Sequence, residues 1–481
     1  MATAIPLNRC RFTAAEIIRA TDAAAPSGFD GATTAVSIDT RSLEAGALFV
    51  ALRSARDGHE YLAAAAARGA AAAIVERGRA SAALPCFMVD DTLAALGALA
   101  HFHLHRIRGP HNPPVIAIGG AAGKTTTKEL TAALARALFG EILATPGNLN
   151  NLIGVPMTLL TLSGAERAAV IECGTNRAGE IARLAAIVEP DVALVLNADI
   201  EHTEGLGTLE GVADEEAALF STARIAVYAP AETLIAERAP AAIARVKFGA
   251  EADADVRLAS RIVVAPGRQR IALALNRALT APGVEPTLEA ALGMIGAAAA
   301  SNAAAAVAAA IAAYGRPLGR DQISAMARAL AAVEPVAGRL ATRTLRGLVV
   351  IDDSYNANPR SVRAALEAAR ESADGLGSRL IVALGEMLEL GALAPAMHSG
   401  ALEDLRRARP DAAVLVGAEF AAALERLAPS LRGGIAAELA AAADSVRAAE
   451  IVRAIVRPGD ILLVKGSRGI AMERIIAALE G

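Results

Sequence analysis

The chain has 481 residues, a formal net charge of −4 and only 3% aromatic residues. This length predicts about three domains. The interspersed charges and scarce aromatic rings exclude the basic face and stacking platforms of a nucleic-acid-binding protein. The three cysteines are far apart, which favours reduced thiols over a disulfide framework or a zinc site. Because the first residues lack a basic stretch followed by an apolar core, we expect a cytoplasmic protein.

Residues 1–108 form the first predicted domain, with short strand and helix patterns such as GALFVAL at 46–52. The segment RGPHNPP (108–114) follows, and its glycine and prolines make it a plausible linker. The second and third predicted domains are residues 109–333 and 334–481.

The second domain begins with a strand, a glycine turn and a helix, in PPVIAIGG (113–120) and KTTTKELTAALARALF (124–139). Glycines at such a junction let the backbone approach a phosphate, and the helix N-terminus offers free N–H groups. Lys124 is expected to reach the β- and γ-phosphates, and the Thr125 hydroxyl to bind Mg²⁺. The alternative is a glycine-rich turn with an incidental lysine.

Two further apolar strands are predicted at 167–173 and 191–197, separated by helical stretches, which indicates a mainly parallel sheet. Glu172 ends the first of them, where a carboxylate suits Mg²⁺ but also suits a helix cap or an arginine pair. His202 follows the second strand, and its spacing alone does not favour a metal role over a structural one. The alanine-rich segment 296–315 is expected to be a buried helix and not a membrane span.

Polar loops follow several predicted strands. Asn148, Asn150 and Asn151 crowd the loop TPGNLNNLIGVP (145–156), which suits a polar ligand or simply a turn. In the third domain, strands are predicted at 347–354, 379–387, 412–420 and 460–467. Asp353 ends the first of these and suits ribose hydroxyls, while Lys465 and Arg468 near the last suit a carboxylate or phosphate. Solvated turns are the alternative.

Together these stretches resemble the Mur ligase family, the ATP-dependent amide-forming enzymes of peptidoglycan synthesis. The branch that adds D-alanyl-D-alanine is matched by SIDTRSLEAGALFVAL, GKTTTKE, TPGNLNNLIGVP, DDSYNANP, GEMLELG and VKGSRGIAME. The family's compact loop, G-x-x-G-K-[ST], is present as Gly120, Gly123, Lys124 and Thr125.

The resemblance implies an α/β fold of three domains: an N-terminal precursor-binding domain, a central P-loop ATPase-like parallel-sheet domain, and a C-terminal Rossmann-like domain that closes on the nucleotide. It also implies ATP and Mg²⁺ as cofactors, UDP-N-acetylmuramoyl-tripeptide and D-alanyl-D-alanine as substrates, and a monomer. The γ-phosphoryl group of ATP would pass to the precursor's carboxylate, and the dipeptide amine would attack the resulting acyl phosphate.

The site residues that the resemblance implies fall into four groups. The catalytic residues are Lys124, Glu172 and His202. The nucleotide-binding residues are Gly120, Ala121, Ala122, Gly123, Lys124, Thr125, Thr126, Asn302, Arg339 and Asp353. The substrate-binding residues are Asp39, Thr40, Arg41, Asn148, Asn150, Asn151, Tyr355, Asn356, Asn358, Lys465 and Arg468. The metal ligands are Thr125, Glu172, His202 and Glu216.

Glu216 marks a departure from the family, whose members usually carry a carbamylated lysine at this place in GVADEEAALF (211–220). A glutamate carries the same charge, so we hypothesise that Glu216, or its neighbour Asp214 or Glu215, supplies the anionic oxygen directly. An exposed acidic helix face is the alternative. Gly119, Ala121 and Ala298 also replace residues common in the family.

A plain ATPase or GTPase switch would give the loops of the third domain no purpose. Two other functions remain open at this stage. One is a related ligase with a different carboxylate and amine. The other is a diverged relative that binds nucleotide or precursor without turnover.

Overall fold

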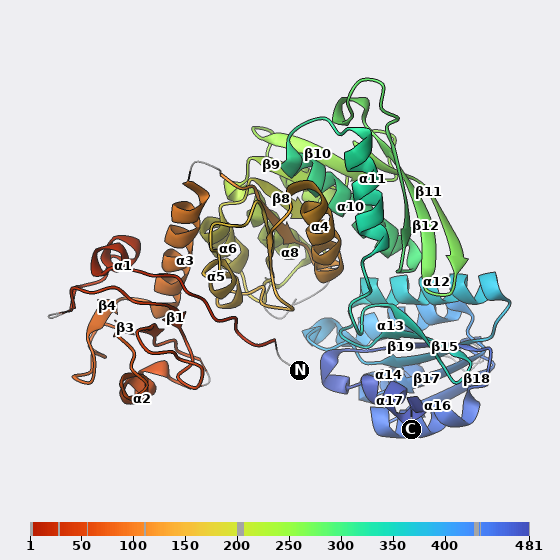
Figure 1. Cartoon of the computed structure of the whole chain (residues 1–481). Coiled ribbons are helices and arrows are strands. Elements are labelled where there is room, and N and C mark those ends of the chain that lie inside the picture. Colours follow the sequence, from red (N-terminus) through yellow and green to blue (C-terminus); the bar gives the residue numbers. More distant parts are fainter. Residues whose placement is uncertain are drawn as a thin grey trace.

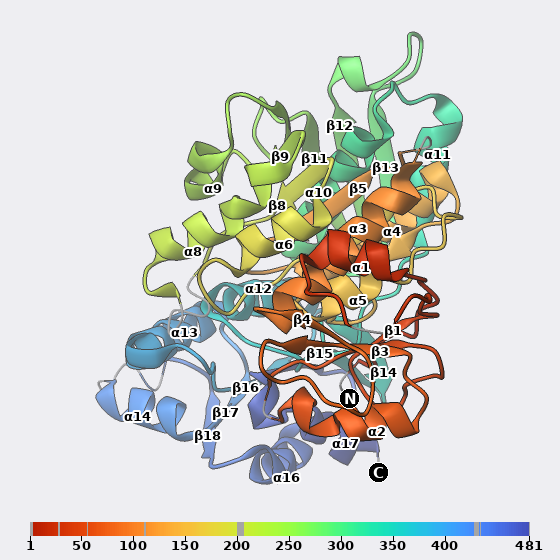
Figure 2. The same ribbon diagram turned by 90° about the vertical axis from the view of Figure 1, so that its left-hand side faces the viewer.

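The computed structural model describes residues 3–26, 29–54, 56–109, 112–199, 206–427, 432 and 434–480. Within these ranges the strands form sheets of four, nine and six strands, and each sheet lies inside one of the three segments proposed as domains. Figure 1 shows the three bodies following one another in chain order, and Figure 2 shows the central body above the other two. The predicted α/β fold class is confirmed. The domain boundaries stay a proposal.

The N-terminal sheet is parallel throughout and small. Its strands are β1 (Val36–Ser37), β2 (Leu48–Val50), β3 (Ala72–Glu76) and β4 (Cys86–Val89). The following helix α3 (Thr92–Arg108) begins where the Asp91 side chain accepts hydrogen bonds from the N–H groups of Leu93 and Ala94.

Helix α3 joins the first two bodies (Figure 1). Its buried residues Leu99 and Leu104 belong to one hydrophobic core with Leu159 of α5 (Gly154–Leu159) and Leu184 of α6 (Glu180–Val188). The N-terminal domain is therefore packed against the central domain through apolar contact.

The central sheet has the order β13-β12-β11-β10-β9-β8-β5-β7-β6. It is parallel from β6 to β11, as predicted, and the remaining two pairings are antiparallel. Its strands are β5 (Val115–Gly119), β6 (Leu143–Ala144), β7 (Ala169–Glu172), β8 (Val192–Val195), β9 (Ile225–Tyr228), β10 (Ala244–Gly249), β11 (Val256–Ala265), β12 (Arg268–Leu275) and β13 (Thr287–Leu292).

Strand β5 lies between β7 and β8. The chain therefore adds β6 and β7 on one side of β5 and then crosses to add β8 on its other side. Ligands bind at such a switch point, beyond the carboxyl ends of the strands. Helix α4 (Lys124–Phe139) begins there, within the range that the sequence predicts.

The C-terminal sheet has the order β14-β15-β19-β16-β17-β18 and is parallel apart from the β14 edge. Its strands are β14 (Ala341–Leu345), β15 (Leu348–Asp353), β16 (Leu380–Gly385), β17 (Ala412–Val416), β18 (Glu438–Ala442) and β19 (Ile461–Lys465). The strand predicted at 412–420 is too long. Gly417, with a φ of 111°, turns the chain after Val416 into helix α14 (Ala418–Arg426).

Helix α10 (Gly296–Tyr314) is the alanine-rich segment predicted to be a buried helix. Among the described residues it is the one helix long and apolar enough to cross a membrane, and 72% of its apolar window is buried within the protein. The core helix of a protein that has no membrane span meets the same criteria. Burial against α4 and the sheet accounts for its composition.

The other helices cover the faces of the three sheets. They are α1 (Ala14–Thr21), α2 (Leu62–Ala67), α8 (Leu209–Ala217), α9 (Thr233–Arg238), α11 (Arg320–Ala331), α12 (Pro359–Leu376), α13 (Ala394–Ala408), α16 (Ser445–Ile455) and α17 (Glu473–Glu480).

Candidate active site

A cavity of about 480 Å³ lies between the central and C-terminal domains. The ends of β5 and β7, with α10, form one wall, while the ends of β15 and β19 and the start of α12 form the other. The predicted residues that line it are Ala121, Ala122, Gly123, Lys124, Thr125, Thr126, Asn148, Asn150, Asn151, Glu172, Asn302, Arg339, Asp353, Tyr355, Asn356, Asn358 and Lys465. The fold therefore brings together segments more than 300 residues apart in the chain.

The loop before α4 has the geometry of a phosphate cradle. Gly120 and Gly123 have φ values of 122° and 89°, which residues with a Cβ rarely adopt. At Gly123, a Cβ would lie 2.8 Å from the Asn302 Oδ1, so any other residue there would displace the Asn302 side chain of α10. No described side chain caps α4, and its first residues, Lys124, Thr125 and Thr126, line the cavity, so its N-terminus is placed to bind an anion.

The Lys124 ammonium folds back onto the loop. Its Nζ donates to the carbonyl oxygen of Gly120 and, over 3.2 Å, to that of Ala121. Both acceptors are neutral main-chain carbonyls at the cavity wall. Because the lysine stem is flexible, the ammonium can turn from them to a charged phosphate.

Glu172 and Thr125 face each other across the loop, as predicted for a metal site. The Glu172 Oε1 accepts hydrogen bonds from the Thr125 hydroxyl (3.2 Å) and the Asn150 amide (2.8 Å). The Glu172 Oε2 is buried and has no hydrogen-bond partner among the described residues. A buried, unpartnered carboxylate oxygen beside a hydroxyl is the oxygen donor set that Mg²⁺ prefers, so these residues fit the ion.

Glu216 is not on an exposed acidic face, so that alternative is wrong. Only 2% of the Glu216 surface is accessible to solvent, and its Oε2 accepts a 2.6 Å hydrogen bond from the Gly120 N–H. A Cβ at Gly119 would lie 3.0 Å from the same oxygen, so the missing side chain there leaves space for this carboxylate.

The neighbours of Glu216 serve other contacts. Asp214 forms an ion pair with Arg238, and Glu215 accepts from the N–H groups of Gly179 and Ile181 at the start of α6. Of the three carboxylates, Glu216 is therefore the one that contacts the phosphate loop.

Cys173 lies directly after Glu172 and is fully buried. Burial, with the nearby carboxylates of Glu172 and Glu216, raises the pKa of its thiol. The thiol therefore stays protonated at neutral pH.

The three predicted loop asparagines have different contacts. Asn150 donates to Glu172, whereas the Asn151 Oδ1 accepts from the N–H groups of Ile153 and Gly154 at the start of α5. Asn148 is exposed and contacts Thr3. Asn151 thus has the local turn role that the sequence left open.

The C-terminal wall is built around a buried ion pair between Asp353 and Lys465, 2.5 Å apart. The Lys465 Nζ also donates to the Asn356 carbonyl, and the Asp353 Oδ1 accepts from the Leu340 N–H. Both carboxylate oxygens of Asp353 therefore have partners within the protein. Asp353 lines the cavity and also holds the Lys465 ammonium in place. Next to this pair, the Arg339 guanidinium lies 4.3 Å from the centre of the Tyr355 ring.

Other predicted residues lie apart from the main cavity. Arg468 borders an adjoining pocket of about 80 Å³ that shares Asn356 and Asn358 with it. Asp39 borders a separate hollow of about 20 Å³ in the N-terminal domain and is paired with exposed Arg41, beside Thr40. His202 lies outside the described residues.

Several cavity residues were missed by the sequence reasoning. Asn197 holds the loop through its side chain, accepting from the Ala122 N–H (2.8 Å) and donating to the Ala122 carbonyl (3.0 Å). It ends a predicted strand, which was a usable signal. Arg360 and Glu232 form an ion pair across the two domains at the cavity. No local pattern reveals that pair, because it depends on how the domains meet.

The cavity and loop agree with the matches to known proteins. Residues 118–310 match the Mur ligase middle domain, and residues 338–468 match the Mur ligase, glutamate ligase domain. The UDP-N-acetylmuramoyl-tripeptide–D-alanyl-D-alanine ligase of Escherichia coli (strain K12) is 35% identical, covering 94% of this chain and 95% of its own. The ligase of the same name from Bacillus subtilis (strain 168) is 30% identical, covering 92% of each chain.

Solved structures agree with these relatives. MurF from Acinetobacter baumannii superposes with a TM-score of 0.85 at 28% identity, covering 99% of this chain and 100% of its own. MurF ligase from Thermotoga maritima in complex with ADP gives a TM-score of 0.78 at 25% identity, covering 92% and 96%. The chain therefore belongs to the Mur ligase family, as its motifs predict.

Proposed function

We propose that this chain is an ATP-dependent amide ligase that joins D-alanyl-D-alanine to UDP-N-acetylmuramoyl-tripeptide in peptidoglycan precursor synthesis. The observation that carries the proposal is the cavity shared by a phosphate loop and a C-terminal wall bearing Lys465. A nucleotide switch needs the loop alone, whereas a ligase needs a second wall for its acid and amine.

The phosphate end of the reaction belongs to the central domain. The N–H groups at the start of α4 and the Lys124 ammonium would hold the β- and γ-phosphates of ATP. Thr125, Glu172 and Glu216, with His202, are the proposed Mg²⁺ ligands. When bound, the ion neutralises charge on the transferring phosphoryl group.

The acid and amine belong between the walls. The precursor's terminal carboxylate would attack the γ-phosphorus, so that a carboxyl–phosphate bond forms, the bond to the β-phosphate oxygen breaks and ADP leaves. The amine of D-alanyl-D-alanine would then attack the acyl carbon, and inorganic phosphate leaves with one former carboxylate oxygen. The chain's contribution is alignment and electrostatic stabilisation by cations such as Lys124.

The remaining roles follow from position. Asn302, Arg339 and Asp353 are proposed for adenosine and phosphate, and Tyr355, Asn356, Asn358, Lys465 and Arg468 for the substrates facing the C-terminal wall. The group Asp39, Thr40 and Arg41, together with the loop of Asn148, Asn150 and Asn151, is proposed for the uridine-linked precursor. The cytoplasm, where ATP is available, is the proposed compartment, and a monomer the proposed state.

Phosphate release from ATP tests the proposal, with both substrates present and with each omitted. L-alanyl-L-alanine serves as a matched control for the dipeptide. Turnover that needs both substrates supports the ligase, whereas hydrolysis indifferent to them indicates a switch and binding without turnover a non-catalytic relative. Turnover only with a different acid or amine would indicate another ligase of the family. If the precursor carboxylate is labelled with ¹⁸O, the label must appear in the released phosphate.

A further inference from the structure

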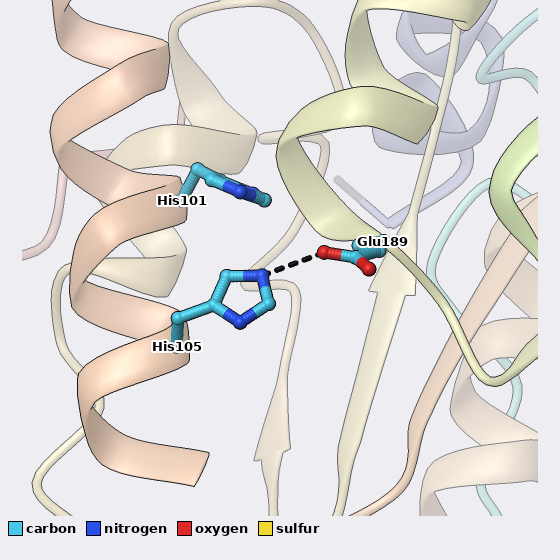
Figure 3. Close-up of side chains that lie close together, drawn as sticks. All are labelled: His101, His105 and Glu189. Carbon is cyan, nitrogen blue, oxygen red and sulfur yellow. Dashed lines mark hydrogen bonds and ion pairs between the residues drawn. The ribbon is translucent and has the colours of Figure 1, made fainter. Parts of the chain in front are cut away.

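A second cluster of side chains lies away from the cavity, where α3 meets the end of α6. It comprises His101 and His105 of α3 and Glu189, the residue that ends α6 (Figure 3). One nitrogen of each imidazole and one carboxylate oxygen lie within 4.8 Å of one another. We propose that this cluster is a binding site for a divalent transition-metal ion of the zinc type, distinct from the Mg²⁺ site.

The two histidines share one face of α3 because they are four residues apart. Their ring centres are 4.4 Å apart, and the rings meet edge to face. Two imidazoles and a carboxylate match the zinc sites that have three protein ligands, two histidines and a glutamate, and leave the fourth position for water. Imidazole nitrogens do not suit Mg²⁺, which prefers oxygen.

A hydrogen bond to the main chain orients the His101 ring for a metal. The His101 Nδ1 lies 3.1 Å from the Ile187 carbonyl oxygen, which can only accept, so Nδ1 carries the proton and Nε2 keeps its lone pair. Metal-binding histidines commonly show this arrangement, with the second nitrogen donating to a main-chain carbonyl.

Glu189 is held in place by its backbone. Its N–H donates to the Ala185 carbonyl, and its carbonyl accepts from the Arg108 guanidinium. Arg108 is itself paired with Asp191, so its charge is balanced. Glu189 has a φ of 41°, a left-handed conformation in which a helix end usually has glycine, and this turns its side chain toward α3.

The cluster needs little rearrangement to take up an ion. Ligand atoms around a tetrahedral zinc lie about 3.3 Å apart, given zinc–nitrogen bonds of about 2.0–2.1 Å. The His105 Nε2 and the Glu189 Oε2 are already 2.6 Å apart, and the ion would replace the proton they share. The side chains of both are nearly half exposed, so an ion can reach them from solvent.

Zinc titration followed by calorimetry tests this site. The protein is first freed of transition metals, and the buffer contains millimolar Mg²⁺. The variants are His105→Ala and Glu189→Gln, with Glu141→Gln as a control that removes an exposed carboxylate elsewhere. We expect the wild type and the control to bind one more equivalent of zinc than His105→Ala, and Glu189→Gln to bind it at least about tenfold more weakly. Zinc bound at Glu172 is unaffected by these changes.

Thermal unfolding gives a second readout, since a ligand that binds only the folded state raises the melting temperature. Zinc should raise it more in the wild type and Glu141→Gln than in the two cluster variants. Equal zinc stoichiometry and affinity in wild type and His105→Ala, or no zinc bound by either, would overturn the proposal. The cluster would then be an ion pair only.

Discussion

The Glu216 carboxylate accepts a 2.6 Å hydrogen bond from the N–H of Gly120, at the start of the phosphate loop. This bond places a buried carboxylate oxygen beside the start of the loop, close to the positive end of the α4 dipole. By its motif, this is the place of the family's carbamylated lysine, and our hypothesis is that Glu216 supplies the anionic oxygen directly, without carbon dioxide.

Carbon dioxide should therefore not affect the wild-type rate. We expect equal phosphate release in buffer stripped of carbon dioxide and in buffer with added bicarbonate. Glu216→Gln should lower the rate by about 10- to 100-fold, since it removes the charge and keeps the shape. Glu216→Lys should regain part of the rate only with bicarbonate. A marked response of the wild type to bicarbonate would sink the direct-carboxylate hypothesis.

Lys124→Ala should abolish turnover while leaving the fold intact. Its ammonium contacts only two main-chain carbonyls, so the loss to stability should be small. Removing a charge that stabilises the transferring phosphoryl group should lower kcat by at least about 10²-fold. Phosphate release and thermal unfolding measure the two effects. Lys247→Ala, which removes a surface cation paired with Asp253, is the control and should retain activity.

Glu172→Gln should raise the Mg²⁺ concentration needed for half-maximal activity by about tenfold or more. The change removes the charge of the buried, unpartnered Oε2 while an amide can still accept from Thr125. The measurement is a Mg²⁺ titration of phosphate release at saturating ATP. An unchanged Mg²⁺ requirement would mean that Glu172 is not a ligand.

His103 should make the protein less stable in mild acid. Burial lowers the pKa of this imidazole below its ordinary 6.5; the Arg106 guanidinium lowers it further, against the opposing Leu162 carbonyl. In the window between the two pKa values the unfolded chain binds more protons, so stability is complete above about pH 6.5 and falls as the pH drops toward the folded pKa.

The free energy of unfolding of the wild type and of His103→Gln, measured between about pH 7 and pH 5, checks this. The variant should be less stable at pH 7, because it disturbs a hydrogen bond to Leu162. The difference in the free energy of unfolding between the wild type and the variant should become smaller as the pH falls. Parallel profiles would show that His103 does not titrate in this range.

Local patterns were enough for some of the strands and for the residues next to them, but they did not predict strands such as β9 to β13. Strand β5, helix α4 and the carboxylate at the end of β7 follow from apolar periodicity and from a glycine turn whose chemistry is local. The burial of Glu216 was not predictable, because three acids in a row on a helix look solvated until the packing of α8 is known. The ion pairs Arg360–Glu232 and Lys465–Asp353 join residues more than 100 positions apart, which a single sequence cannot pair.

Strand β19 is the last strand among the residues that the structure describes, yet it lies in the middle of its sheet, between β15 and β16. A nascent polypeptide cannot complete that sheet until residues 461–465 have left the ribosome, and Lys465 arrives only with them. A chain that stops before residue 461 therefore lacks part of the cavity wall and should not consume ATP. Proteolytic loss of residues 461–480 should likewise separate β15 from β16 and inactivate the protein.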